Sequence, residues 1–146
     1  MDLFQSSSNQ TVIGIDISSH DVVIMALQQS DSEVIDLTGK TKKFSLDDDD
    51  DAAQIQAFHD SFHAHLDGFD AHQIAVLKRI RKGKFTASAT SFKLEALIQN
   101  YRSKSVQVVP STTVKAFLKK EPLPFSPPNK YQEKAFGLAW YLLHQA

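Results

Sequence analysis

Residues 11 to 27 read TVIGIDISSHDVVIMAL, an apolar run interrupted mainly by the polar residues 18 to 21. The residues on either side of this interruption have the composition of buried β-strands, and the interruption itself has the composition of a tight turn. The run therefore predicts a buried β-hairpin. One carboxylate, Asp16, lies inside the first strand. It needs a specific explanation, because a charged group buried without a partner is costly.

Downstream of this hairpin, short apolar runs alternate with amphipathic segments. A short apolar run fits a buried strand, and apolar side chains spaced three and four apart fit a helix with one buried face. We expect, in order, a third antiparallel strand between residues 33 and 46 that is interrupted near Gly39, a helix after residue 51, a strand at 73–77, a helix from Ser91, a strand at 106–109, a helix from Ser111 to Lys120 and a last helix from about Lys130 to His144.

This alternation predicts an α/β fold with the order βββ-α-β-α-β-α-α. The first three strands pair antiparallel, and the two later strands join the sheet in parallel because each is reached through a helix. We therefore expect a mixed five-stranded sheet flanked by helices. It forms a single domain over residues 11–146, preceded by a flexible tail over residues 1–10.

Two of the expected helices carry distinctive patterns. The first follows a run of five aspartates, residues 47–51, whose negative charge suits a helix N-terminus. The last has two apolar stripes instead of one, formed by Ala135, Leu138, Ala139 and Leu142 and by Phe136, Trp140 and Leu143. We expect both stripes to be buried, and a homodimer through this helix is the alternative.

Composition excludes several classes of protein. The 146 residues contain no cysteine, which excludes a disulfide framework and any thiolate nucleophile or metal ligand. No apolar run reaches the roughly 18 residues of a membrane span. The first ten residues lack the basic region and apolar core of a secretory signal. We therefore expect a cytoplasmic protein that does not associate with a membrane.

Charge is distributed unevenly along the chain. Residues 1–77 carry a net charge of −11 and residues 78–146 a net charge of +10, although the whole chain has a net charge of −1. Such asymmetry predicts a molecule with one basic face, unless folding intermixes the two halves.

The strongest basic signal is the segment KRIRKGKF, which contains Lys78, Arg79, Arg81, Lys82, Lys84 and Phe85. It follows a predicted strand, and open α/β sheets bind ligands at the carboxyl ends of their strands. We expect the cations to contact phosphate and Phe85 to stack on a base, which makes nucleic acid the expected partner. Lys115, Lys119 and Lys120 extend this surface if the next helix lies alongside. The alternative is a solvated loop, or one paired with the aspartate run.

The motif Gly14-Ile15-Asp16 resembles the G-[IL]-D signature in the first strand of the RuvC-type branch of the ribonuclease H-like fold, the Holliday-junction resolvases. In that branch the aspartate of the motif is the first metal ligand, and Asp16 is the matching position. The stretches KRIRKGKF, SFKLEALIQ and KYQEKAF also resemble a family of small bacterial proteins catalogued as a domain of unknown function. These resemblances span most of the chain after residue 10 and imply a fold rather than an activity.

The other metal ligands implied by the RuvC-type pattern are missing. That pattern has a glutamate at the end of the fourth strand, where this chain has Lys78, and an Asp-x-x-Asp pair on the last helix, where it has Tyr131 and Lys134. We expect the neighbouring Glu133 to point elsewhere, since one residue is a 100° rotation on a helix. Two-metal hydrolysis needs several converging carboxylates. We therefore expect a catalytically degenerate site without a metal or cofactor, in which Asp16 is vestigial and Lys78 replaces the metal's charge.

Two other functions stay open at this point. The first is a metal-dependent nuclease that binds Mg²⁺ through a rearranged set of carboxylates, namely Asp16, Asp21, Glu95 and Glu133. The second is a protein-interaction or assembly module without a small ligand. Two weaker metal signals are the pair His59 and His63, which share a helix face, and the aspartate run; each has too few or wrongly spaced ligands for a known site.

Overall fold

The computed structural model describes residues 9–79 and 88–145 of the chain. Its strands are β1 (Gln10–Ser18), β2 (Asp21–Ser30), β3 (Glu33–Asp36), β4 (Lys43–Ser45), β5 (Gln73–Leu77) and β6 (Val106–Val109). Its helices are α1 (Ala52–Asp67), α2 (Ala89–Gln99), α3 (Ser111–Lys120), the 3-10 turn η2 (Lys130–Gln132) and α4 (Glu133–Leu143). The predicted order is confirmed from α1 onward, whereas four strands rather than three precede that helix. The expected tail over residues 1–10 lies mostly outside the described residues.

The sheet has six strands rather than the predicted five. Its order is β3-β2-β1-β5-β6, with β4 also paired to β2. β2 runs antiparallel to β1, β3 and β4, whereas β5 runs parallel to β1 and to β6. The sheet is therefore mixed, as predicted.

The extra strand arises because the expected third strand is divided in two. Gly39 has a positive φ of 76°, which turns the chain out of the ladder after β3. Within the gap, the hydroxyl of Thr38 accepts a hydrogen bond from the backbone N–H of Ala26 at 2.9 Å, in place of a backbone carbonyl. Pairing with β2 then resumes at β4. The predicted interruption near Gly39 is thus confirmed, but it separates two strands.

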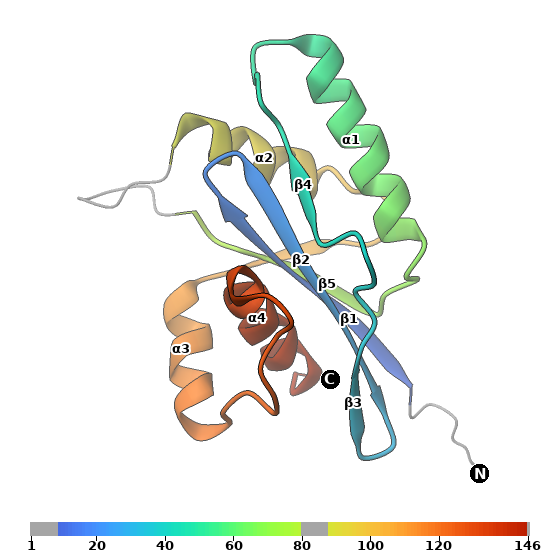
Figure 1. The fold of residues 1–146 in the computed structure, drawn as a ribbon, viewed down its shortest axis with the longest axis vertical. Helices are drawn as coiled ribbons and strands as arrows, with labels where there is room; N and C mark the ends of the chain where they lie inside the picture. Colours follow the sequence, from blue (N-terminus) through green and yellow to red (C-terminus); the bar gives the residue numbers. More distant parts are fainter. Residues whose placement is uncertain (1–8, 80–87, 146) are drawn as a thin grey trace.

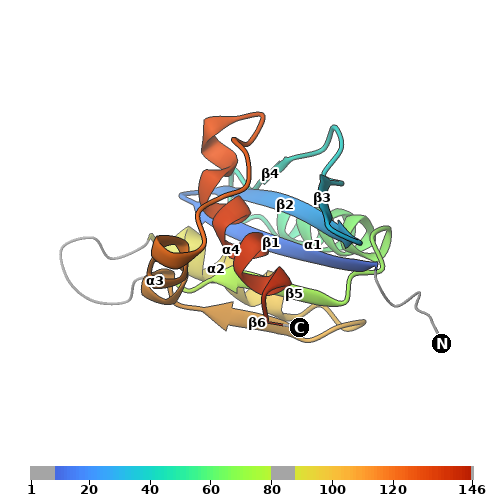
Figure 2. The same cartoon turned by 90° about the horizontal axis from the view of Figure 1, so that it is seen from below.

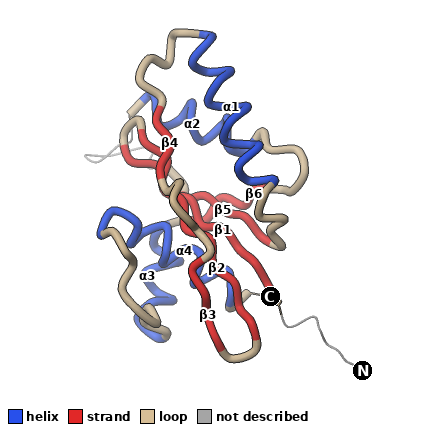
Figure 3. The backbone as a smooth tube through the Cα atoms, turned by 45° about the vertical axis from the view of Figure 1, so that its right-hand side comes forward, coloured by secondary structure: helices blue, strands red, loops and turns tan. Residues whose placement is uncertain are grey.

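The sheet lies between two layers of helices (Figure 1). α1 and α2 cover one face, and α3 and α4 lie on the other, as a view turned by 90° also shows (Figure 2). A third view shows the same separation, with the strands passing between the two helical pairs (Figure 3). β1 is the middle strand of the order, and the two helical layers cover both of its faces, so nearly all of its residues are buried.

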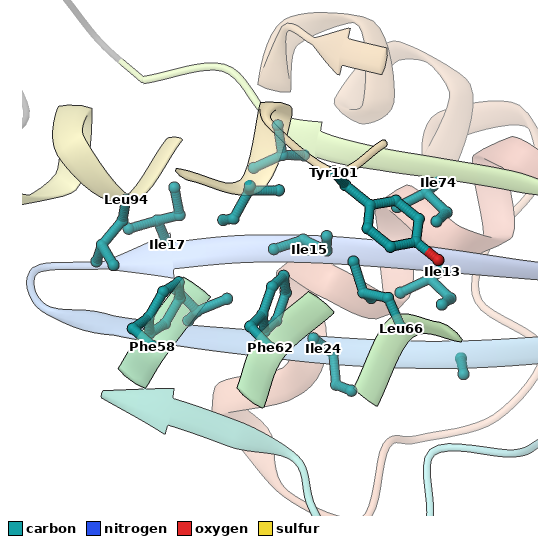
Figure 4. Close-up of a cluster of buried hydrophobic side chains, with 14 of the residues drawn as sticks. Ile13, Ile15, Ile17, Ile24, Phe58, Phe62, Leu66, Ile74, Leu94 and Tyr101 are labelled. Atoms are coloured by element: carbon teal, nitrogen blue, oxygen red, sulfur yellow. The ribbon is translucent and has the colours of Figure 1, made fainter. Parts of the chain in front are cut away.

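The face toward α1 and α2 holds the larger apolar cluster. The alternating isoleucines of β1 point into it, together with the apolar stripe of α1 and Leu94 of α2 (Figure 4). The buried α1 residues are Phe58, Phe62 and Leu66, with Ile55 and Phe69 packed around them, so one apolar face of α1 packs on the sheet. Each isoleucine or phenylalanine buried here contributes roughly 1.5–3 kcal/mol by leaving water.

The opposite face packs closely against α4. Since side chains alternate along a strand, Val12, Gly14 and Asp16 all face this side. A Cβ atom added to Gly14 would lie 2.7 Å from the backbone nitrogen of Ala139 and closer still to the carbonyl oxygen of Ala135. The hydrogen side chain of Gly14 therefore allows the backbone of α4 to approach β1 directly, which fixes where α4 begins.

One helix start differs from the sequence-based expectation. α2 begins at Ala89 rather than at Ser91, because Ser88 caps it by accepting a hydrogen bond from the backbone N–H of Ser91 at 3.2 Å. α3 runs over Ser111–Lys120 as expected, and Pro110 occupies its cap position without a side-chain bond. A proline fits there because it has no N–H to satisfy and its φ suits the turn. At α1, Asp51 is the cap, accepting from the backbone N–H of Ala53 at 3.0 Å.

We predict that Gly14→Ala destabilises the protein by about 3 kcal/mol, because a backbone clash cannot be relieved by a rotamer change. The melting temperature, followed by circular dichroism, should fall by about 6–12 °C. Gly68→Ala is the matched control, since Gly68 has ordinary helical angles and its nearest contact for a Cβ atom is at 3.4 Å. Equal melting temperatures for the two variants would show that α4 does not depend on this contact.

Candidate functional site

A pocket of about 500 Å³ opens at the carboxyl ends of β1 and β5. The starts of α3 and α4 complete its walls. We call it the carboxyl-edge pocket; it is lined by Asp16, Ile17, Ser18, Ser19, Leu77, Lys78, Arg79, Ser111, Val114, Lys115, Leu118, Glu133, Lys134 and Gly137. Its position is the edge at which open α/β sheets usually bind ligands.

Asp16 is the buried polar group of this pocket. Its side chain is 8% exposed, and it points toward the α4 face because it shares the alternation of Gly14. Among the described residues, no group donates a hydrogen bond to its carboxylate and no cation lies within ion-pairing distance. Burial raises the pKa of Asp16 above its ordinary value of 3.8, and the positive charges of Lys134 and Arg79 offset part of that rise.

Four cations line the same pocket from three elements. Lys78 and Arg79 follow β5, Lys115 comes from α3, and Lys134 comes from the first turn of α4. The three lysines are exposed and Arg79 is half-buried. Lys78 therefore lies in the same pocket as Asp16, but the cations that act most on its pKa are Lys134 and Arg79.

Arg79 is held by its backbone rather than by its side chain. Its N–H donates a hydrogen bond of 3.0 Å to Oε2 of the buried Glu95, which fixes where the chain leaves β5. Its guanidinium Nε is buried, and no described residue accepts a hydrogen bond from it. Arg79 thus brings to the pocket a charged group whose hydrogen-bonding capacity is unused.

Lys134 and Glu133 are placed by the buried start of α4. Gln132, which is fully buried, donates a hydrogen bond of 3.3 Å to the carbonyl of Ile24 in β2 and accepts one from the Asn129 amide at 3.2 Å. Together with the close contact at Gly14, this anchors the helix start against the sheet. The first turn of α4 therefore presents both Glu133 and Lys134 to the pocket.

The described residues that line the pocket include two carboxylates, Asp16 and Glu133, and four cations. Mg²⁺ needs more oxygen ligands than these two side chains supply, and adjacent positive charges oppose its binding. Among the described residues, three metal-ligating groups lie close together at Asp48, Asp49 and Asp50, and not in this pocket.

The sequence of residues 10–142 matches the model of the family described as "Protein of unknown function (DUF3010)". The chain belongs to this family. No curated protein matches the sequence. The likeness to a family of unknown function that the sequence indicated is therefore confirmed.

Solved structures show which fold this family member adopts. A structure of Thermus thermophilus RuvC is similar with a TM-score of 0.67 and 14% identity, covering 93% of this chain and 97% of that one. T. thermophilus RuvC in complex with a Holliday junction substrate has a TM-score of 0.65 and 15% identity, covering 94% of this chain and 97% of that one. Fowlpox virus resolvase in complex with Holliday junction DNA has a TM-score of 0.51 and 8% identity, covering 93% of this chain and 98% of that one. The chain thus has the ribonuclease H-like fold of the RuvC type, as predicted.

The other carboxylates of the nuclease hypothesis lie elsewhere. Asp21 accepts a hydrogen bond of 2.5 Å from the Ser45 hydroxyl at the end of the β1–β2 hairpin. Glu95 is buried beneath the chain after β5, where it binds the backbone of Arg79. Neither lines the pocket. Glu133, by contrast, does line it, although we expected its side chain to point elsewhere.

The basic segment is described only in part. Lys78 and Arg79 lie in the pocket, whereas Arg81, Lys82, Lys84 and Phe85 lie outside the described residues. Lys115 of α3 lines the pocket, and Lys119 and Lys120 are exposed at the end of the same helix. The cations at the pocket therefore come from three elements, and sequence analysis had not anticipated a role for Lys134.

The side chains of the two weaker candidate metal sites, the histidine pair and the aspartate run, make contacts within the protein. Nε2 of His63 lies 2.8 Å from the carbonyl of Leu97, and Nε2 of His59 lies 3.1 Å from the Asn100 amide, so both rings act between α1 and α2. In the aspartate run, Lys93 lies 3.7 Å from Asp49 and 3.5 Å from Asp50. The run thus interacts with α2 as well as preceding α1.

Both apolar stripes of α4 are used inside the chain. Phe136, Leu138 and Leu142 are fully buried between the sheet and α3, and Trp140 donates a hydrogen bond of 3.0 Å to the carbonyl of Glu121. The expected burial is confirmed, while the homodimer through this helix and the assembly function stay predictions. None of the described helices combines the length and the apolar character that crossing a membrane requires.

We predict that Asp16→Asn raises the melting temperature at pH 7 by about 2–4 °C, the shift that roughly 1 kcal/mol produces in a domain of this size. Because burial raises the pKa of Asp16 in the folded state, ionisation penalises that state. The contribution of Asp16 to the free energy of unfolding of the wild type is therefore fully present below the ordinary aspartate pKa. It declines as the pH rises through the higher pKa that Asp16 has in the folded state. The variant lacks this decline.

Thermal unfolding between pH 3 and pH 8 checks this prediction, with the difference between variant and wild type vanishing at the acidic end. Asp60→Asn is the control, since its side chain is 81% exposed on α1. A destabilised Asn variant at pH 7 would mean that the Asp16 carboxylate has a favourable partner in the free protein.

Proposed function

We propose that this chain is a catalytically degenerate ribonuclease H-like domain that binds phosphate groups of nucleic acid in the carboxyl-edge pocket. The observation that carries the proposal is the charge of the pocket. Lys78, Arg79, Lys115 and Lys134 converge there around two carboxylates. Lysine and arginine contacts to phosphate supply most of the affinity of nucleic-acid binding proteins.

These cations are available to a ligand. No described carboxylate lies within ion-pairing distance of the four side chains, although Asp16 is close enough for Lys134 and Arg79 to influence its pKa. A phosphate entering the pocket therefore meets positive charges without first having to break an ion pair.

The fold supports the choice of nucleic acid over other phosphorylated ligands. T. thermophilus RuvC and Fowlpox virus resolvase, which share this fold, form complexes with Holliday junction DNA. In the sequence, the basic segment that starts at Lys78 continues after Arg79 with three further cations, Arg81, Lys82 and Lys84. This agreement between charge and fold favours DNA or RNA as the partner.

We predict salt-dependent binding of single-stranded and junction DNA, measured by fluorescence anisotropy between 25 and 300 mM salt. Arg79→Ala combined with Lys134→Ala should weaken binding at least about tenfold and reduce the salt slope by about 0.7 for each lost contact to a single strand.

Arg102→Ala combined with Lys104→Ala is the matched control. It removes the same charge from exposed residues just before β6, at the opposite edge of the sheet. Equal losses in both double variants would mean that only net charge matters and that the pocket is not the binding site. No binding at the lowest salt concentration would refute the proposed function.

A metal-dependent nuclease has one observation in its favour, since Asp16 and Glu133 line the same pocket. Two carboxylates are too few ligands for a two-metal site, and the four cations that line the pocket oppose the binding of Mg²⁺. We therefore predict no cleavage of labelled junction, single-stranded or duplex substrates with Mg²⁺ or Mn²⁺. Cleavage that is lost in Asp16→Asn and in Glu133→Gln would instead establish the nuclease, whereas cleavage that persists in both variants belongs to a contaminant.

A further inference from the structure

The carboxyl-edge pocket contains two groups whose hydrogen-bonding capacity is unused. The carboxylate of Asp16 is buried and receives no hydrogen bond from the described residues. The guanidinium Nε of Arg79 is buried and donates none to them. Polar groups of buried residues normally have hydrogen-bond partners. A donor and an acceptor left unsatisfied in one pocket indicate a ligand that satisfies both.

Such a ligand presents a hydrogen-bond donor to Asp16 and an anionic acceptor to Arg79. An ammonium group or a metal ion is a poor partner for Asp16 here, because the positive charges of Lys78, Lys115 and Lys134 line the same pocket and would repel it. A neutral hydroxyl avoids that repulsion and forms a strong bond to a carboxylate. The anion is a phosphate under the proposed function. The ligand therefore carries a free hydroxyl and a phosphate close together.

The walls of the pocket favour the sugar of a nucleotide over its base. None of the described lining residues is aromatic, so no described side chain there stacks on a base. Ile17, Leu77 and Leu118 provide an apolar surface, and the volume of about 500 Å³ is larger than a phosphate alone requires. A sugar with its phosphate therefore fits the pocket, and the base lies outside it.

The burial of Asp16 favours the end of a nucleic-acid strand as the ligand over an internal nucleotide. Asp16 as a whole is 8% exposed and lines the pocket, so a group reaches its carboxylate by entering the pocket. An internal nucleotide has backbone on both sides and needs two exits, whereas a terminal nucleotide needs one. In DNA, moreover, only terminal sugars have a free hydroxyl.

We infer that the carboxyl-edge pocket holds the 3′-terminal nucleotide of a nucleic-acid strand. Its free 3′-hydroxyl donates a hydrogen bond to Asp16, and its phosphate lies at Arg79 and Lys134. This inference rests on the proposed function and assigns a strand end as the ligand of the same pocket.

The test compares two 5′-phosphorylated DNA strands of identical sequence, one ending in a 3′-hydroxyl and the other in a 3′-deoxy sugar. The strand with the hydroxyl should bind about tenfold more tightly, since a hydrogen bond to a buried charged group contributes roughly 1.5–3 kcal/mol. This comparison uses the wild-type protein and so does not depend on a variant that folds. Equal affinities would overturn the inference and leave the proposed function standing.

A variant assigns the effect to Asp16. Asp16→Ala should bind the two strands with affinities that differ less than twofold, while Asp60→Ala, an exposed aspartate on α1, should keep the full difference. If discrimination survives in Asp16→Ala, the hydroxyl does not bind Asp16 and the inference is wrong. If no strand binds at low salt, the inference and the proposed function fail together.

Two further ligands distinguish a strand end from a free nucleotide and from an internal 2′-hydroxyl, which carry the same hydroxyl and phosphate groups. Adenosine 5′-monophosphate, added as a competitor, should bind at least tenfold more weakly than the strand. If it competes as well as the strand, the ligand is a free nucleotide. An RNA strand with a 3′-deoxy end should bind no better than its DNA counterpart. If it binds as tightly as a strand with a free 3′-hydroxyl, an internal 2′-hydroxyl enters the pocket. Either result overturns the assignment to a strand end.

Discussion

The contact between Gly14 and α4 is the constraint on which the site depends. Because Gly14 has no side chain, the helix backbone rests directly on the middle strand, at distances that a Cβ atom would not allow. Gln132 holds the residue just before the helix to β2, so the position of the first turn is fixed from two sides. The side chains of that turn therefore enter the pocket beside Asp16, two residues beyond Gly14 on the same face of β1.

This arrangement places a lysine where a further carboxylate would be needed for metal binding. Lys134 and Arg79 lower the pKa of Asp16, which burial raises, and they do so from pocket walls rather than through an ion pair. Exchanging an acid for a base at one helical position changes the chemistry that a shared fold supports. Under the proposed function, a lysine at this position contacts phosphate instead of a metal ion, without altering the packing that positions the residue.

The sequence predicted the order of elements, the central place of Asp16 and the apolar stripes, because these follow from periodicity and from a recognisable motif. It failed where small backbone changes decide the outcome. The positive φ of Gly39 divides one expected strand into two. The expected last helix begins as the 3-10 turn Lys130–Gln132, which advances about 120° per residue rather than 100°. We expected Glu133 to point elsewhere because it lies 100° from Lys134 on the helix, but both residues line the pocket.

Asp16 itself gives the last step of the argument. A buried carboxylate usually stabilises a fold through the hydrogen bonds that it accepts, but the described residues give Asp16 none. Its neighbours in β1 show that the strand pairs through its backbone and packs through isoleucines, neither of which requires an acid at this position. Burial raises the pKa of this carboxylate, and the charges of Lys134 and Arg79 offset only part of that rise. Under the proposed function, a donor that enters the pocket with a phosphate would offset the rest, which would explain the aspartate at residue 16 by ligand binding.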